Sequence, residues 1–292
     1  MAHLLLLLTM LFWGGNAVAG KLAVGHVSPM LLTFFRWGFA FLVLWLAGRR
    51  LAVDWPLLRP KLPLLAGLGF LGFSLFNVAL YAALLFTSAI NTSIEQAGIP
   101  MLIFGLNFLL FRQRVAWGQA VGFTLSVLGV ALTAAHGDLA ALFSLDLNRG
   151  DALMLVAVVV YALYTVLLRF RPELHWMSLM IVLTGAAAAA TLPFVAAEAM
   201  LGALVLPDAQ GWAVVLYTAL FPSILAQIFY IRGVELIGAN RAGLFINLVP
   251  VFGTVLSLLI LREAFHAYHA LAIVLVLGGI ALAEWSGRRM AR

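Results

Sequence analysis

Two ionisable residues, Arg36 and Glu95, stand inside long apolar runs of the sequence. A charge is costly in lipid, so ionisable side chains within membrane spans commonly mark a binding site, a proton path or an internal ion pair. Both residues are expected a few positions below the outer membrane surface. Three interpretations stay open: the two pair as an external gate, Glu95 carries a proton, or they form a static structural pair.

Amide side chains and aromatic rings with a polar edge form a second group. Trp13 and Asn16 share a helical face of one apolar run, and Tyr161 and Tyr164 share the matching face of another. Such rings can stack on an organic molecule or contact its ammonium group. Polar groups at this depth must face protein or a wet cavity, and bonding between helices is the alternative role for each. The predicted cavity residues are Trp13, Asn16, Asn77, Tyr81, Gln96, Tyr161, Tyr164, Gln227, Tyr230 and Asn247.

Two prolines, Pro100 and Pro250, lie in the middle of apolar runs. Proline removes a helical hydrogen bond and clashes with the preceding turn, so it kinks a helix and leaves a carbonyl group free. Broken helices at matching positions in two halves of a chain indicate a binding site or hinge. We predict that both prolines are hinge points. The alternative is that they only shape packing, since membrane helices tolerate proline.

Several patterns that suggest other chemistry are better explained without it. Gly67, Gly69 and Gly72 spell a dinucleotide-binding fingerprint, but they lie in a hydrophobic run without a strand–helix context, which favours close helix packing. His266 and His269 have no third ligand nearby and are expected in an exposed loop. The sequence has no cysteine, and we find neither an HExxH motif nor paired intramembrane aspartates. No catalytic residue, metal site or cofactor is predicted, and the protein is not expected to be an enzyme.

Membrane-spanning helices must position these residues, because 65% of the sequence is hydrophobic and only 10% is charged. About a quarter of the residues of a soluble domain are charged. The basic residues lie between apolar runs without interleaved aromatics, so the net charge of +6 indicates membrane topology and not nucleic-acid binding. The predicted spans are 4–21, 30–48, 62–86, 91–111, 117–135, 151–169, 177–198, 211–232, 241–261 and 268–285.

The second half of the chain resembles the first. At a shift of 150 positions, residues 89–132 align with residues 239–282 without a gap, and 10 of the 44 pairs are identical. The matched residues include Pro100 with Pro250 and Arg112 with Arg262. We predict a first five-helix repeat at 1–140, an external connector at 141–150 and a second repeat at 151–292.

Loop charges orient the spans. With both termini in the cytoplasm, thirteen of the seventeen Lys and Arg residues fall inside, as the positive-inside rule requires. Because each predicted repeat has an odd number of spans, the two must cross the membrane in opposite directions. The two repeats of such an inverted pair can exchange conformations. This exchange opens a central cavity first to one side of the membrane and then to the other.

The chain resembles the EamA-type transporters of the drug/metabolite transporter superfamily. The first half carries Phe12-Trp13-Gly14-Gly15-Asn16 with Lys21, Phe34-Phe35-Arg36-Trp37 and Arg112-Gln113; the second carries Ala239-Asn240-Arg241-Ala242-Gly243, Pro250-Val251-Phe252, Leu261-Arg262-Glu263-Ala264-Phe265 and Gly278-Gly279-Ile280-Ala281-Leu282. One departure is Gln113, where the second half keeps the family's acidic residue, Glu263.

This resemblance implies ten helices in two inverted repeats, a central cavity and export of small metabolites. Within the family the chain is most similar to bacterial amino-acid exporters, including the aromatic type. We therefore expect a multi-pass secondary transporter of the bacterial inner membrane that exports amino acids or related metabolites by alternating access. Its expected partners are a small-molecule substrate and membrane lipid, with proton coupling left open and no nucleic acid. The alternatives are an importer or an exporter of drugs or nucleotide precursors and, from another class, an intramembrane enzyme or sensor.

Overall fold

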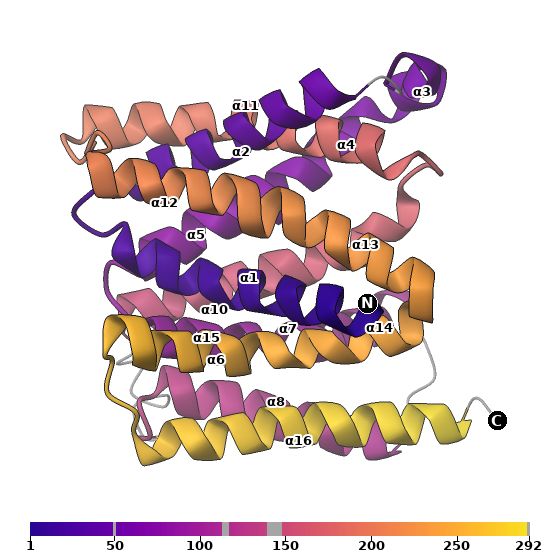
Figure 1. Ribbon diagram of the computed structural model, residues 1–292. Helices are drawn as coiled ribbons and strands as arrows, with labels where there is room; N and C mark the ends of the chain where they lie inside the picture. The colour runs from indigo at the N-terminus through magenta and orange to yellow at the C-terminus, as the bar shows by residue number, and fades with distance from the viewer. Residues whose placement is uncertain (49–50, 113–116, 139–147, 291–292) are drawn as a thin grey trace.

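Helices make up the secondary structure of the part of the chain that the computed structural model describes, residues 1–48, 51–112, 117–138 and 148–290. Within these residues, ten helical segments are long and apolar enough to cross a membrane. They follow the ten predicted spans in order, which confirms the expected all-helical, ten-span fold. Figure 1 shows the long helices lying side by side in one bundle.

The first five spans run back and forth through the bundle. A short helix, α3 (Leu51–Leu58), and the 3-10 turn η1 (Arg59–Lys61) precede the third span, in a stretch expected to be a loop. Leu58 at the end of α3 is fully buried, which anchors this helix to the bundle. The five spans are α1 (Ala2–Leu22); α2 (Pro29–Ala47); α4 (Leu62–Gly69) with η2 (Phe70–Leu75) and α5 (Phe76–Ala83); α6 (Ala89–Gln96) with α7 (Ile99–Phe111); and α8 (Trp117–Ala134).

The second five spans begin at the opposite end of the bundle. They are α10 (Arg149–Leu167) with η3 (Leu168–Phe170); α11 (Trp176–Met200); α12 (Ala209–Leu220) with η4 (Phe221–Leu225) and α13 (Ala226–Ile237); α14 (Ala239–Phe245) with η5 (Ile246–Leu248), α15 (Val249–Leu256) and η6 (Ser257–Leu261); and α16 (Ala267–Met290). The start of α1 and the end of α16 share one end of the bundle, whereas α10 starts at the other (Figure 1). Residues 141–147 of the predicted connector lie outside the described residues, and 149–150 belong to α10. The repeat boundaries stay a prediction.

Polar residues begin the apolar helices at the end where α10 starts. The hydroxyl oxygen of Ser88 accepts a hydrogen bond from the backbone N–H of Asn91, and the Asn148 side chain accepts one from Gly150 N–H. These side chains satisfy N–H groups that have no partner within the helix. The helices therefore begin where a capping residue precedes an apolar run.

Four spans are interrupted, in two matching pairs. The third and eighth spans contain the π-helical turns η2 and η4 at corresponding places. The fourth span breaks at Ala97 and Gly98 before α7, and the ninth passes through the 3-10 turn η5 before α15. Pro100 and Pro250 lie in the first turn of α7 and of α15, where a missing N–H leaves no bond unmade. The breaks predicted at the two prolines are present, and their role as hinges stays a prediction.

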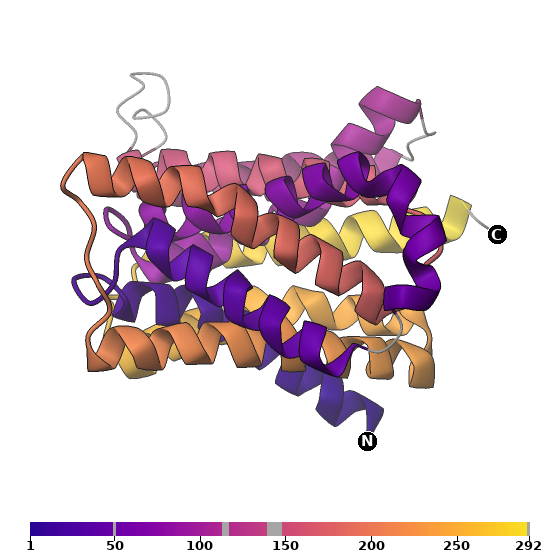
Figure 2. The same cartoon turned by 90° about the horizontal axis from the view of Figure 1, so that it is seen from above.

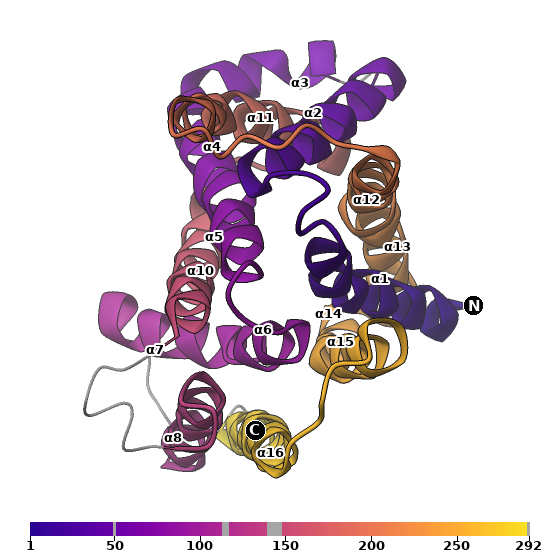
Figure 3. The same ribbon diagram turned by 90° about the vertical axis from the view of Figure 1, so that its left-hand side faces the viewer.

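Helices α8 and α16 pack along each other at one edge of the bundle, as Figure 3 shows. A Cβ atom on Gly122 would lie 2.3 Å from the carbonyl oxygen of Gly279, and one on Gly279 would lie 2.5 Å from that of Gly122. Ser126 Oγ donates to the carbonyl of Val276 at 3.2 Å across the same interface. Small residues let two membrane helices approach closely, which gives this pair the character of a scaffold.

Spans from the two halves of the chain lie side by side. Helix α1 packs against α13 and α15 (Figure 3), while α2 packs against α11 (Figure 2). α10 lies beside α5 and α7. Helices α1 and α2 each contact both α5 and η4, so the first, second, third and eighth spans meet in the interior, and the candidate site lies there.

Candidate functional site

Arg36 lies at the centre of a buried polar cluster and is only 5% exposed. Its Nη1 donates to Asn16 Oδ1 and Asn77 Oδ1, both at 2.8 Å, and to the Tyr81 hydroxyl at 2.5 Å. Its Nε donates to Ser223 Oγ at 2.8 Å. Tyr81 in turn donates its hydroxyl hydrogen to Asn16 Oδ1 at 2.8 Å. We call these five residues the Arg36 cluster.

The Arg36 cluster is assembled from α1, α2, α5 and η4. Three predicted cavity residues, Asn16, Asn77 and Tyr81, come together here with Arg36, and Ser223 joins them from the second half of the chain. The guanidinium carbon also lies 4.6 Å from the centre of the Trp37 ring. All the hydrogen-bond acceptors in the cluster are neutral. They hold the cation in place without cancelling its charge.

Glu95 does not pair with Arg36, which corrects the gate and ion-pair interpretations. The guanidinium bonds to α1, α5 and η4, whereas Glu95 lies on α6 with 0% exposure. Neither carboxylate oxygen of Glu95 has a hydrogen-bond partner among the described residues. The pairing fails because Glu95 lies on α6, whereas the side chains that meet the guanidinium come from α1, α5 and η4. A proton-carrying role for Glu95 stays a prediction.

The π-helical turns offer carbonyl oxygens to the tryptophans beside the cluster. Within η2, the carbonyl of Phe73 accepts from Trp37 Nε1 at 2.8 Å and from Asn77 Nδ2 at 2.7 Å. Within η4, the carbonyl of Pro222 accepts from Trp13 Nε1 at 3.1 Å. π-helical turns are frequent at functional sites because they alter the regular direction of side chains. Neither turn is predicted from the sequence, although Pro222 in the middle of the eighth span is a signal for one of them.

The predicted aromatic residues form two pairs. The rings of Trp13 and Tyr230 lie 5.4 Å apart between centroids, as do those of Tyr161 and Tyr164. Trp13 bonds to the carbonyl of Pro222, which precedes Ser223, and the Tyr161 ring lies 4.7 Å from that of Phe76, which precedes Asn77. The aromatic pairs are therefore neighbours of the cluster.

The remaining predicted cavity residues stand apart from the cluster. Gln96 donates its side-chain N–H to the carbonyl of Thr92 in its own helix at 3.1 Å. Gln227 lies one helical turn beyond Ser223, and Asn247 lies in η5; both are half-buried. A role for these three in a cavity stays a prediction.

A hollow of about 620 Å³ lies between α1, α12 and the segment from α15 to η6. Its walls are mainly apolar and include Phe12, Tyr217 and Leu256. The phenolic oxygen of Tyr217 packs against Gly15, which precedes Asn16 in α1. Binding sites for small organic molecules commonly measure about 300–1,000 Å³. The hollow has room for such a molecule, and Gly15 in its wall is the sequence neighbour of a cluster residue.

A second polar network, which the sequence did not predict, lies at the end of the bundle opposite the termini. Asp151 has 0% exposure and accepts from Thr87 Oγ1, from Asn91 Nδ2 at 3.3 Å and from His136 Nε2 at 2.7 Å. His269 Nε2 lies 2.9 Å from Asn91 Oδ1. The expectation that His269 lies exposed in a loop is wrong: it begins α16 and is 2% exposed. No group of three or more His, Cys, Asp or Glu side chains in the described residues is arranged to hold a metal.

The same end of the bundle is closed by side chains that bond to backbone groups. Lys21 Nζ donates to the carbonyls of Leu84 and Thr87 at 2.9 and 2.7 Å. The Glu263 carboxylate accepts from the N–H groups of Ala89 and Ile90 at 2.8 and 3.0 Å, at the start of α6. A carboxylate at a helix N-terminus satisfies free donors and the helix dipole. Gln113, the counterpart of Glu263, lies outside the described residues.

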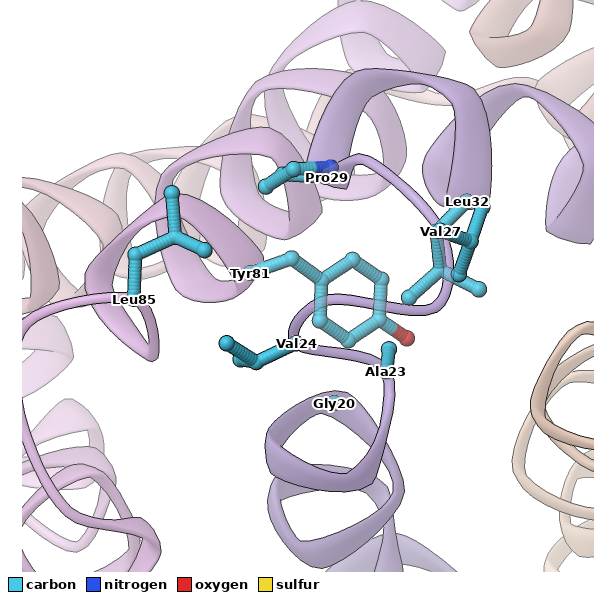
Figure 4. Close-up of a pocket in the computed structure, with 8 residues that line it drawn as sticks. All are labelled: Gly20, Ala23, Val24, Val27, Pro29, Leu32, Tyr81 and Leu85. Carbon is cyan, nitrogen blue, oxygen red and sulfur yellow. The ribbon is translucent and has the colours of Figure 1, made fainter. Parts of the chain in front are cut away.

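Apolar side chains pack around Tyr81 on the side of the Arg36 cluster that faces the loop after α1. The Tyr81 ring lies among Val27, Leu32 and Leu85, over Gly20 (Figure 4). This packing leaves no room for a water molecule. The cluster is therefore shut off from this side by the side chains around Tyr81.

Loop contacts reinforce the closure. The Glu198 carboxylate accepts from Ser28 Oγ at 2.6 Å and from Met30 N–H at 3.3 Å. Asp208 caps α12 through Gly211 N–H and lies 2.7 Å from His26 Nδ1. The Gly211 N–H and then the His26 side chain hold the pKa of the Asp208 carboxyl below its usual range. The loops after α1 and α11 are thus tied together.

Several known proteins are similar to this chain in sequence or in fold. The EamA-like transporter family matches residues 1–135 and 148–285. Two Bacillus subtilis proteins named uncharacterized transporters, YetK and YyaM, are 29% and 25% identical over 96% and 97% of this chain and 85% and 93% of their own length. An uncharacterized transporter of Archaeoglobus fulgidus is 26% identical over 96% of each chain. A crystal structure that is 22% identical aligns with 100% of this chain and 99% of its own, with a TM-score of 0.64, and so shares the fold.

Proposed function

Because this chain belongs to the EamA-like transporter family, we propose that it exports amino acids, the aromatic ones among them, or related small metabolites. It is a multi-pass membrane transporter, and the family and its relatives point to transport and not to an enzyme. The proposed mechanism is alternating access across the bacterial inner membrane. Membrane lipid surrounds the protein, and the substrate binds between the spans.

The observation that carries the proposal is the matched interruption of four spans around a buried polar cluster. η2 and η4 lie in the third and eighth spans, and the breaks before Pro100 and Pro250 lie in the fourth and ninth. A helix can bend where its hydrogen bonds are interrupted. Paired interruptions let two similar halves change shape in turn, which supports an inverted-repeat mechanism with the units 1–140 and 151–292.

One end of the bundle is closed. It is the end that holds Lys21 and Glu263, and in the topology that we predict from loop charges it lies outside the cell. Trp13, Gln227 and Tyr230 are half-buried, whereas the residues of the Arg36 cluster are buried. We infer a conformation in which the substrate enters from the cytoplasm.

The test is counterflow in proteoliposomes. Vesicles loaded with an unlabelled amino acid should accumulate the labelled one, and the rate should be highest for aromatic amino acids. A panel of drugs and nucleosides, tested in the same vesicles, separates the alternative substrates of this fold. Absence of flux for every amino acid, with flux for another compound class, would refute the substrate assignment. Repeating the assay with and without a pH gradient tests coupling to protons.

A further inference from the structure

The charge of Arg36 has no counter-ion in the described part of the protein. The ion pairs of the described residues do not include Arg36, and its acceptors are two amides and two hydroxyls. A buried charge is normally paired with an opposite charge. A bundle that needed only a connection between α1, α2, α5 and η4 could use a neutral donor at lower cost. The retained cation therefore points to an anion that is bound and then released.

The hydrogen bonds of Arg36 also leave donors free. Nε bonds to Ser223, and Nη1 bonds to Asn16, Asn77 and Tyr81. Nη2 donates to no described residue and is not among the polar atoms sealed from solvent. A guanidinium group presents its donors in a planar fork that matches a carboxylate. The protein engages Nε and Nη1, and the two N–H groups of Nη2 stay available to an anion.

The surroundings of Arg36 suit a molecule with an anionic group and an apolar or aromatic body. The guanidinium carbon lies 4.6 Å from the centre of the Trp37 ring and 6.0 Å from that of the Tyr81 ring. The hollow of about 620 Å³ is lined by Gly15, which precedes Asn16 of the cluster, and by Tyr217. Neither carboxylate oxygen of Glu95 on α6 has a hydrogen-bond partner among the described residues, so Glu95 is not a counter-ion of Arg36.

We propose that Arg36 binds the carboxylate of the transported molecule through its Nη2 side. This inference rests on the proposed function, since it assigns the substrate class of the same site. Asn16, Asn77, Tyr81 and Ser223 position the guanidinium. The substrates are then carboxylates with an apolar body, and compounds in which the carboxylate is masked are poor ligands.

The first test uses the unaltered protein and two readouts. Thermal unfolding of the purified protein is measured with L-phenylalanine, 3-phenylpropionate and L-phenylalaninamide, and the same compounds compete for counterflow of labelled L-phenylalanine. We expect both carboxylates to stabilise the protein and the amide to bind about tenfold more weakly, a difference of about 1.4 kcal/mol. Equal stabilisation by the amide, or none by either carboxylate, overturns the inference. Stabilisation by the carboxylates without counterflow refutes amino-acid transport and leaves the carboxylate subsite supported.

The second test compares Arg36→Gln with Arg232→Gln. Arg232 is an exposed arginine on α13 that pairs with Glu235 at 2.7 Å, so its replacement controls for loss of one positive charge. Arg36→Gln should abolish the preference for carboxylate over amide, whereas Arg232→Gln should keep it. Arg36→Lys keeps the charge without the fork and should weaken carboxylate binding by about tenfold. A preserved preference in Arg36→Gln overturns the inference, and if that variant does not fold, the comparison of ligands on the unaltered protein decides.

Discussion

Helix α1 crosses α15 at Gly14, and the closeness of this crossing can be tested by adding one methyl group. A Cβ atom on Gly14 would lie 2.7 Å from the backbone nitrogen of Gly253 and 2.9 Å from the carbonyl oxygen of Val249. Both contacts are with backbone atoms, which cannot rotate away as the end of a side chain can. Gly14→Ala must therefore push α1 and α15 apart.

The magnitude follows from two opposing effects. Alanine favours a helix over glycine by about 1 kcal/mol, and overpacking a close interface costs about 1–3 kcal/mol. Gly67→Ala provides the matched control, because Gly67 also lies in a membrane helix and a Cβ atom there would meet nothing within 4 Å. Both variants replace glycine by alanine in a helix, so both gain the same helix preference. The difference between them isolates the steric cost, about 1–3 kcal/mol in favour of Gly67→Ala.

The assay is thermal unfolding of the two purified variants in the same detergent, followed by intrinsic tryptophan fluorescence. By the scaling for domains of similar size, Gly14→Ala should melt about 2–12 °C below Gly67→Ala. Equal melting temperatures, or a higher one for Gly14→Ala, would refute the close crossing of α1 and α15.

Three further predictions concern acidic side chains. Glu95→Gln should remove the pH dependence of transport if Glu95 carries a proton, and unchanged flux with an unchanged pH profile in proteoliposomes would contradict that role. Asp151→Ala should lower the free energy of unfolding by about 1–3 kcal/mol, because it leaves buried polar neighbours without their acceptor; denaturation that matches the unaltered protein would count against the network. Asp208→Ala should lower the melting temperature at neutral pH by removing the cap on Gly211 and the bond to His26. Because the pKa of Asp208 is depressed in the folded protein, its stabilisation is present above the usual aspartate pKa of about 3.9 and is lost as the pH falls through the depressed value. The two proteins should therefore converge in melting temperature in acid, and a constant difference down to that pH would argue against the cap.

The sequence alone determined the ten spans and the places where two of them break. Apolar length is a local property, so each run of roughly 20 residues could be recognised without knowing its neighbours. Pro100 and Pro250 act on their own helix through a missing N–H group, which is also local. The family resemblance is local in the same sense, because it rests on short sequence segments that follow one another in a fixed order.

The tertiary structure decided which polar residues meet. Arg36 bonds to Ser223, 187 positions away, and does not bond to Glu95, although both acid and base were visible in the sequence. The π-helical turns change the direction of side chains, so Ser74 bonds to Thr191 of α11 while Asn77, three residues on, faces Arg36. Helical periodicity assigns each residue to a face of its own helix, but the partner of that face depends on how all the helices pack. That is why the sequence pointed to four of the five members of the Arg36 cluster, whereas Ser223 and the meeting of all five came from the fold.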